Sequence, residues 1–207
     1  MVIDVNECDL NNDYYHFTNV ANIQSIVNGG LQPLVGTASN MVGDRPNVSI
    51  SHGGKGVMGI INSFIHMFSI LSISQIPNEF RKYFVDDIND FTSNIPVGLD
   101  ISCRAVARKL KDEVFFRIIL DESMLREARI GGLTGFDINL PTAIDGSNLQ
   151  LVTNSGEILT AFDFAQFIYE RVKDKDIFRE MNEDFFRMFE MEQSKLFLND
   201  EDFGKHR

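Results

Sequence analysis

The sequence predicts an α+β fold, because segments with strand character occur together with segments whose apolar residues recur at helical spacing. Strand character, marked by alternation or by aromatic and β-branched content, is found in residues 14–18, 47–51, 113–120, 135–140 and 148–152. Helical spacing is found in residues 20–27, from 57 onward, and in 78–91, 160–172 and 176–198. With 207 residues, 43% of them hydrophobic and 18 of them phenylalanine, the chain can fill a dry core.

The first predicted strand, residues 14–18, leads directly into a short helix. Asn19 is a favoured N-cap, and the apolar residues after it repeat at helical spacing. Gly29 and Gly30 then supply a left-handed stop, with Leu31 folding back. The residues from 32 to 47 are rich in glycine, proline, serine and asparagine, which indicates an irregular loop long enough to bind a ligand.

The later elements follow from the same signals. Residues 113–120 are nearly continuous in apolar character, which predicts a central strand of a sheet. The apolar run from residue 57 predicts a helix enclosed by the core, and Pro77 and Pro96 bracket the helix predicted over 78–91. Thr160, with Asp163 three residues later, resembles a capping box for the helix that follows.

Charge and cysteine usage restrict the class of protein. A formal net charge of -11 disfavours nonspecific binding to nucleic acid, which depends on lysine and arginine at phosphates. Cys8 and Cys103 are far apart and form neither a disulfide framework nor a metal-binding pair, so a cytoplasmic protein without a metal site is expected. The amino terminus lacks a signal-peptide pattern, and polar residues interrupt the apolar stretch 57–76, so no membrane association is expected.

Residues 14–33 carry a pattern of known type: His16-Phe17-Thr18 on a strand, then a helix, then Gly30-Leu31-Gln32-Pro33. This pattern resembles the opening of the ADP-ribosyltransferase superfamily, which includes poly(ADP-ribose) polymerases, RNA 2′-phosphotransferases and DNA-targeting toxin ADP-ribosyltransferases. The resemblance implies that His16 and Thr18 hold NAD. It also implies the fold of that superfamily, a split antiparallel β-sheet with flanking helices.

A second element of those families is a strand that runs into a helix, and residues 47–52 followed by the apolar run are similar to it. Ser51 would then face the nicotinamide riboside. Many members stack an aromatic ring on nicotinamide near this point, and here the candidates for that ring are His52, Phe64, Tyr14 and Tyr15. Lys55, in the segment Gly53-Gly54-Lys55-Gly56, is a candidate contact to the pyrophosphate of NAD, and a flexible strand-to-helix connection is the alternative interpretation.

The third element of those families is a glutamate that opens a late strand, and residues 136–152 resemble that stretch. Asp137 occupies the place of the acid, and Glu157 is the alternative acid, although the sequence favours an ordinary role for Glu157 as a charged residue in the turn before Thr160. A carboxylate beside the ribose would stabilise the oxocarbenium-like charge that develops when the nicotinamide bond breaks. The arm of Asp137 is shorter by one C–C bond, about 1.5 Å, and positioning errors of about 1 Å can cost about 100-fold in rate.

These observations predict an ADP-ribosyltransferase-like domain over residues 1–173 and a C-terminal helical extension over 174–207 that packs on it. NAD would be the substrate, without a metal, and the acceptor a macromolecule, protein rather than nucleic acid. Bacterial relatives of this type are often toxins or effectors, which implies such a role here. The phenylalanine- and methionine-rich face of residues 176–198 either packs on its own domain or forms a homodimer. The alternative function is a catalytically inactive module that binds a nucleotide or a protein.

Overall fold

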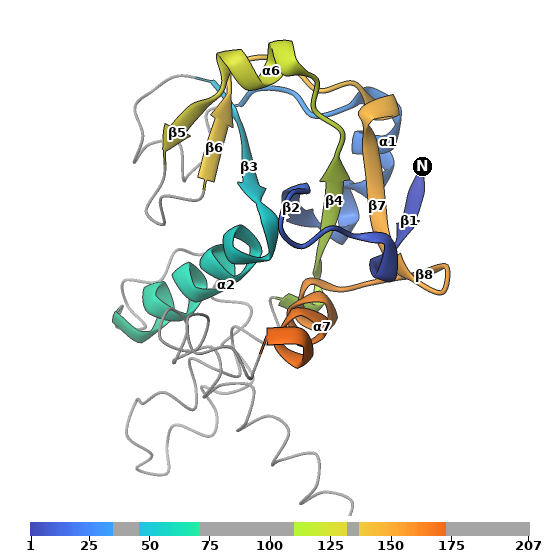
Figure 1. Ribbon diagram of the computed structural model, residues 1–207, viewed down its shortest axis with the longest axis vertical. Helices are drawn as coiled ribbons and strands as arrows, with labels where there is room; N and C mark the ends of the chain where they lie inside the picture. The colour runs from blue at the N-terminus through green and yellow to red at the C-terminus, as the bar shows by residue number, and fades with distance from the viewer. Residues whose placement is uncertain (35–45, 71–109, 132–136, 173–207) are drawn as a thin grey trace, which may run out of the picture. The chain divides into compact units, whose positions relative to one another are not determined.

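The computed structural model describes residues 1–34, 46–70, 110–131 and 137–172 (Figure 1). The chain divides into two units, Met1–Ile60 with Leu110–Ile168 and Ile61–Lys109 with Tyr169–Arg207. The helices predicted over 78–91 and 176–198, and the domain boundary predicted after residue 173, lie outside the described residues. All the described strands belong to the first unit.

The described strands form one sheet of eight. Seven of them follow the order β1-β7-β4-β2-β3-β6-β5, and β8, outside this order, pairs with β7. Every neighbouring pair in it is antiparallel except β1 with β7. The strands are β1 (Val2–Asp4), β2 (Tyr14–Asn19), β3 (Val48–His52), β4 (Glu113–Ile118), β5 (Arg129–Gly131), β6 (Asp137–Leu140), β7 (Leu149–Asn154) and β8 (Glu157–Ile158). With the helices below, this sheet confirms the α+β class.

Among the described residues, a helix comes after a strand in three places where the sequence predicts it. The α-helices are α1 (Ile23–Gly29), α2 (Gly53–Ile70), α6 (Glu122–Glu127) and α7 (Ala161–Val172), and 3-10 turns are η1 (Val5–Glu7), η2 (Val20–Asn22) and η6 (Gly146–Asn148). The Asn19 side chain accepts the Ala21 amide at 2.9 Å, so it caps η2, which precedes α1. The predicted cap of α7 is confirmed, because the Asp163 amide donates to Thr160 Oγ1 at 3.1 Å.

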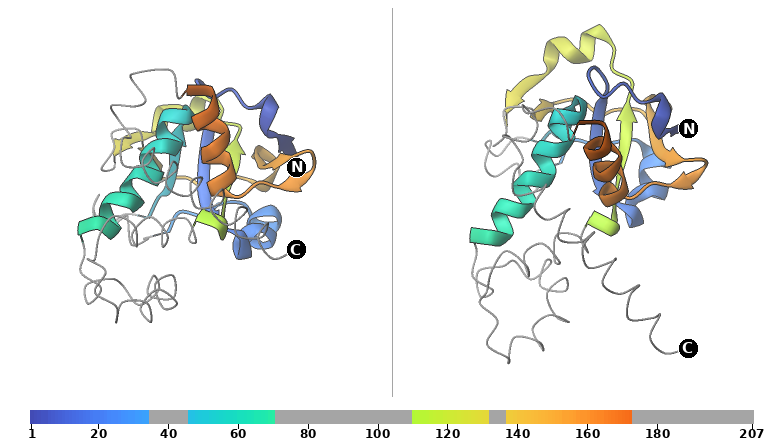
Figure 2. Two further views of the ribbon diagram at one scale, coloured as in Figure 1. Left: turned by 90° about the horizontal axis from the view of Figure 1, so that it is seen from below. Right: turned by 60° about the horizontal axis from the view of Figure 1, so that its bottom comes forward.

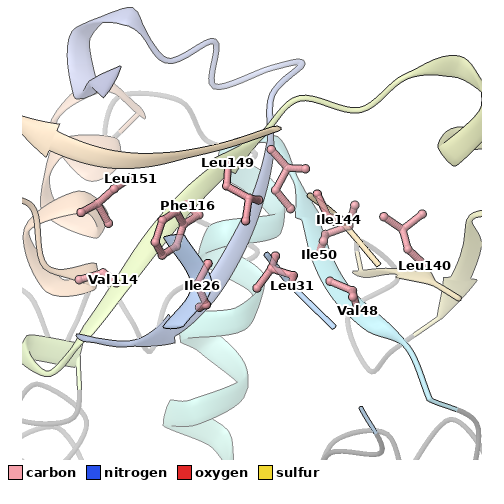
Figure 3. Packing of buried hydrophobic residues seen from close by; sticks show 11 residues of the cluster. Ile26, Leu31, Val48, Ile50, Val114, Phe116, Leu140, Ile144, Leu149 and Leu151 are labelled. Carbon is pink, nitrogen blue, oxygen red and sulfur yellow. The ribbon is translucent and has the colours of Figure 1, made fainter. Parts of the chain in front are cut away.

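Strand β4 lies inside the sheet, between β2 and β7, as its apolar sequence predicts. A cluster of buried hydrophobic residues covers one face of the sheet and includes Ile26 of α1 (Figure 3). On the other face, Phe164 of α7 packs edge-on against Tyr15 and Phe115, each at a ring-centroid distance of 5.4 Å. Helices α2 and α7 are neighbours in both views of Figure 2. A Cβ on Gly54 of α2 would lie 3.7 Å from Cγ2 of Ile168 in α7. Each face of the sheet therefore has its own core.

The structure differs from the sequence predictions at the sheet edges. Residues 2–4, for which the sequence predicts no element, form the parallel strand β1, in which Val2 pairs with Leu151 and Ile3 is buried. Glu157 belongs to β8, after a turn in which Ser155 and Gly156 have positive φ. Strand β5 and helix α6 were also not predicted. Strand β1 is fixed by a partner far along the chain, and β5, β8 and α6 are too short for the periodicity that predicts longer elements.

Gly30 ends α1 as predicted, because it has φ 71° and ψ -170° and its amide donates to Ile26 O at 2.8 Å. This region of backbone space is essentially restricted to glycine. A Cβ on Gly30 would also lie 2.2 Å from Ile144 O. That carbonyl accepts the Leu31 amide at 2.8 Å, so the glycine permits a close approach between the helix stop and the segment before η6.

We expect Gly30→Ala to lower the free energy of unfolding by at least about 2 kcal/mol, because both the backbone angle and the contact with Ile144 O become strained. Gly29→Ala is the matched control, since nothing lies within 4 Å of a Cβ at Gly29. Urea unfolding followed by circular dichroism measures both variants. Equal stability of the two variants would contradict the assigned role of Gly30.

Candidate functional site

Most of the predicted catalytic and ligand-binding residues lie on three neighbouring strands of the sheet, β2, β3 and β6, whereas Lys55 is on α2 and Glu157 is on β8. The register of the three strands forms one row, in which Tyr15 pairs with Ser51 and Ser51 pairs with Asp137. The preceding pair on β2 and β3 joins Tyr14 to His52. Residues that are between 36 and 122 positions apart in the sequence are thus brought onto adjacent strands.

Strands β2 and β3 separate beside this row of paired residues. Strand β2 pairs with β4 along six residues, but with β3 only at Tyr14 and Tyr15. Beyond that point β3 pairs with β6 and leaves β2, a divergence visible in Figure 1. At the opening the His16 side chain reaches across from β2, and its Nδ1 lies 2.9 Å from Ser49 O. A side-chain hydrogen bond therefore replaces the backbone ladder where the two strands separate.

The partner of His16 defines its protonation. Because a carbonyl oxygen only accepts hydrogen bonds, Nδ1 carries the proton and Nε2 is the acceptor. The pKa of His16 lies below its usual value because burial disfavours the charged ring, and the bond to Ser49 O opposes that effect. His16 is therefore neutral near pH 7 and can accept a hydrogen bond from a ligand hydroxyl at Nε2, but it contributes no positive charge.

Two other predicted contacts are engaged within the protein. Thr18 is buried, and its Oγ1 accepts a hydrogen bond from Asn22 Nδ2 at 3.1 Å, which fixes the turn from β2 into α1. Ser51 is completely buried. A Cβ on Gly56 would lie 2.9 Å from Ser51 Cβ, so the first turn of α2 covers this serine. In this arrangement a ligand reaches Ser51 only if α2 moves.

The aromatic candidates separate by accessibility. Tyr14 and the exposed His52 stack on each other, with ring centroids 4.7 Å apart and planes 21° apart. Tyr15 is fully buried against Phe115 and Phe164 and cannot stack on a ligand. The side chain of Phe64 lies outside the described part of the chain. Of the candidate rings in the described residues, Tyr14 and His52 are therefore the two that a ligand bound beside β2 and β3 can contact.

The glycine-rich segment has a packing role. Helix α2 begins at Gly53, immediately after β3, so no flexible connection separates them. The amide of Gly53 donates to Asp13 O at 2.8 Å, and that of Gly54 donates to Leu10 O at 2.7 Å. Two of the amides that a phosphate would use are therefore occupied by the loop before β2. Lys55 is exposed on the first turn of α2.

The two candidate acids lie far apart. Asp137 opens β6 and pairs with Ser51. Glu157 is on β8, which pairs with β7, and β4 and β2 lie between β7 and β3 in the sheet. The structure places Asp137, and not Glu157, beside the strand of Ser51.

A polar cluster that the sequence did not predict lies where β2 begins and β4 ends. Arg117 Nη1 contacts Asp13 Oδ2 at 3.3 Å, and Arg117 Nε donates to Gln150 Oε1 at 2.8 Å. Burial raises the pKa of the neighbouring Cys8 thiol and of the Tyr15 hydroxyl. The available signal was Arg117 itself, a charged residue in the middle of the most apolar predicted strand.

Within the described ranges, no group of three or more histidine, cysteine, aspartate or glutamate side chains is arranged to hold a metal ion. The helices of those ranges are too short or too polar to span a membrane. Comparison with protein-family models, with curated proteins and with solved structures finds no match for this chain. Functional inference therefore rests on the residues and their geometry.

We expect stability to fall as the pH drops below about 6.5, because His16 binds a proton more readily in the unfolded chain than in the folded one. His16→Gln keeps a hydrogen-bond donor for Ser49 O and does not titrate. The stability difference between wild type and this variant, from urea unfolding at several pH values, should change by at most about 1.4 kcal/mol per pH unit. A difference that is constant from pH 7 to pH 5 would contradict the lowered pKa.

Proposed function

We propose that this chain is an ADP-ribosyltransferase-like protein that binds NAD and transfers ADP-ribose to a macromolecule. The observation that carries the proposal is the order of β2, β3 and β6, which brings the strands of His16, Ser51 and Asp137 together where the sheet opens. We propose a protein acceptor, because the net charge of -11 disfavours a polyanion. A toxin or effector role and action in the cytoplasm belong to the same proposal.

In this proposal the nicotinamide nucleotide lies across the opening between β2 and β3. His16 Nε2 accepts a hydrogen bond from a ribose hydroxyl, and the neighbouring rings of Tyr14 and His52 offer a stacking surface. The bond between nicotinamide and C1′ of the ribose breaks, and neutral nicotinamide leaves with the electron pair. The acceptor nucleophile attacks C1′ and loses its proton, and a carboxylate stabilises the positive charge that develops at the ribose. We propose Asp137 for this role, which requires the strands to rearrange around the ligand, because Asp137 is in register with Ser51 and Tyr15, on the opposite face of the sheet from His16.

A second candidate function is a nucleotide- or protein-binding module of the same fold without catalysis. Complete burial of Ser51 beneath α2 favours it, because the predicted contact to the nicotinamide riboside is then covered. The shorter carboxylate at Asp137 favours it as well. Both candidates use the same opening, so turnover of NAD distinguishes them.

The experiment incubates the purified full chain with NAD labelled in the adenylate part and measures nicotinamide release and label transfer to protein. We expect Asp137→Asn to reduce turnover about 100-fold or more, because the charge that stabilises the transition state is lost. His16→Ala should weaken NAD binding about tenfold, the effect of one directed hydrogen bond of about 1.4 kcal/mol.

Glu157→Gln is the matched control, since Glu157 is exposed on β8 and should leave turnover within about twofold. Saturable NAD binding without turnover, weakened by His16→Ala, would support the inactive binding module. Turnover that depends on Glu157 instead of Asp137 would overturn the assignment of the acid. If NAD neither binds nor reacts, the transferase fails, and of the second candidate only the protein-binding form remains.

A further inference from the structure

Asn139 of β6 carries a buried hydrogen-bond donor that no group in the described part of the chain satisfies. The residue is only 9% exposed, and its Nδ2 atom is buried without a hydrogen-bond partner. The Tyr15 hydroxyl is a second atom of this kind, but Phe115 and Phe164 enclose that ring. An unsatisfied buried donor lowers the stability of a fold, so the Asn139 amide calls for an acceptor that a ligand can supply.

The register places Asn139 beside the opening between β2 and β3. Asn139 pairs with Ser49, which lies beyond the last pair of β3 with β2, the pair of Ser51 with Tyr15. Residues paired in this way project from the same face of a sheet, with Cβ atoms about 4.5–5.5 Å apart. Ser49 is exposed, and its carbonyl oxygen lies 2.9 Å from His16 Nδ1. A ligand that reaches Ser49 at the opening therefore comes close to the Asn139 amide.

The opening gives a ligand access to both faces of the sheet. Ser49 and Asn139 lie on the same face as Ser51 and Asp137, because residues two positions apart on a strand share a face. The first turn of α2 covers Ser51, whereas Ser49 is exposed. His16 belongs to the opposite face. A ligand that lies across the opening can thus contact His16 from one face, and Ser49 with Asn139 from the other.

The charges near Asn139 favour an uncharged group as its partner. The side-chain amide is itself a neutral donor. Asp137 is two residues earlier on β6, about 7 Å along the strand, and Arg129 of β5 pairs with Asn139. The formal charges of Asp137 and Arg129 offset each other, so these positions offer no net charge to a phosphate. Because a buried charge needs a counter-charge, an uncharged oxygen is the acceptor that suits a buried neutral donor.

We propose that Asn139 is a ligand-binding residue of the opening, and that its Nδ2 donates to an uncharged oxygen of the nicotinamide riboside, either a ribose hydroxyl or the carboxamide carbonyl. The exposed Ser49 hydroxyl contacts the same part of the ligand. This inference rests on the proposed binding of NAD, and it adds a contact on the face opposite His16. The amide stays unpaired in the free protein because its acceptor belongs to the ligand.

Asn139→Leu tests the proposal through two measurements on the purified full chain. Leucine has a similar shape but no donor, so isothermal titration should show NAD binding at least about tenfold weaker. In the absence of NAD the melting temperature should rise by about 2 °C or more, because the unsatisfied buried donor is removed.

Thr153→Val is the matched control for both measurements. Thr153 is also buried, but its Oγ1 donates to Ile3 O at 3.0 Å, on a strand that β4 and β2 separate from β3. The variant loses a hydrogen bond that is formed within the protein. It should therefore melt at a lower temperature than the wild type and bind NAD with unchanged affinity.

Two further variants test the same contact by other means. Asn139→Asp keeps the shape of the side chain and replaces the donor by an acceptor, so it should weaken NAD binding as much as Asn139→Leu does. Ser49→Ala, at an exposed position, should weaken NAD binding about threefold and leave the melting temperature unchanged. Titration of Asn139→Leu with ADP-ribose and with nicotinamide distinguishes the two oxygens: weaker binding of ADP-ribose indicates a ribose hydroxyl, and weaker binding of nicotinamide indicates the carboxamide.

Unchanged NAD affinity in Asn139→Leu and Asn139→Asp would refute this inference and leave the transferase proposal standing. A fall in the melting temperature of Asn139→Leu, like that expected for Thr153→Val, would refute it as well, because the amide would then be satisfied within the protein. If NAD does not bind to the wild type, the proposed binding of NAD fails, and this inference fails with it.

Discussion

The antiparallel pairing of β2 with β4 is the interaction on which the rest of the described structure depends. It extends over all six residues of both strands, whereas β3 shares only two pairs with β2. Since β2 is held along its whole length from one side, its other edge can separate from β3 without losing its place in the sheet. The opening at His16 is therefore a stable feature, supported by a strand that is anchored elsewhere.

Burial on both faces of β4 makes this anchor rigid. Phe115 contacts Tyr15 and Phe164 on one face, and Phe116 belongs to the hydrophobic cluster on the other face. Aromatic pairs of this geometry contribute about 0.5–1.5 kcal/mol each beyond the area that they bury. The same packing encloses Tyr15 and, with the first turn of α2, Ser51. Two of the residues nearest to the predicted site thus serve the core.

The two ends of β2 offer different chemistry that has one electrostatic property in common. At the opening, His16 is neutral because burial of its ring disfavours the charged form and lowers its pKa, and Nε2 is its acceptor nitrogen. At the other end, the Asp13 carboxylate and the Arg117 guanidinium compensate each other. Neither place therefore offers a net positive charge to a phosphate.

The sequence by itself determined the local elements and their limits: the strand of His16, the stop at Gly30, the cap at Thr160 and the central position of β4. These features depend on neighbours a few residues away, on backbone angles and on side-chain periodicity. Only the tertiary structure decided that β1 completes an edge, that Glu157 pairs with β7 away from β3, that Ser51 is covered by Gly56, and that Arg117 contacts Asp13. Strand order and register depend on contacts between residues tens of positions apart, and no local pattern encodes them.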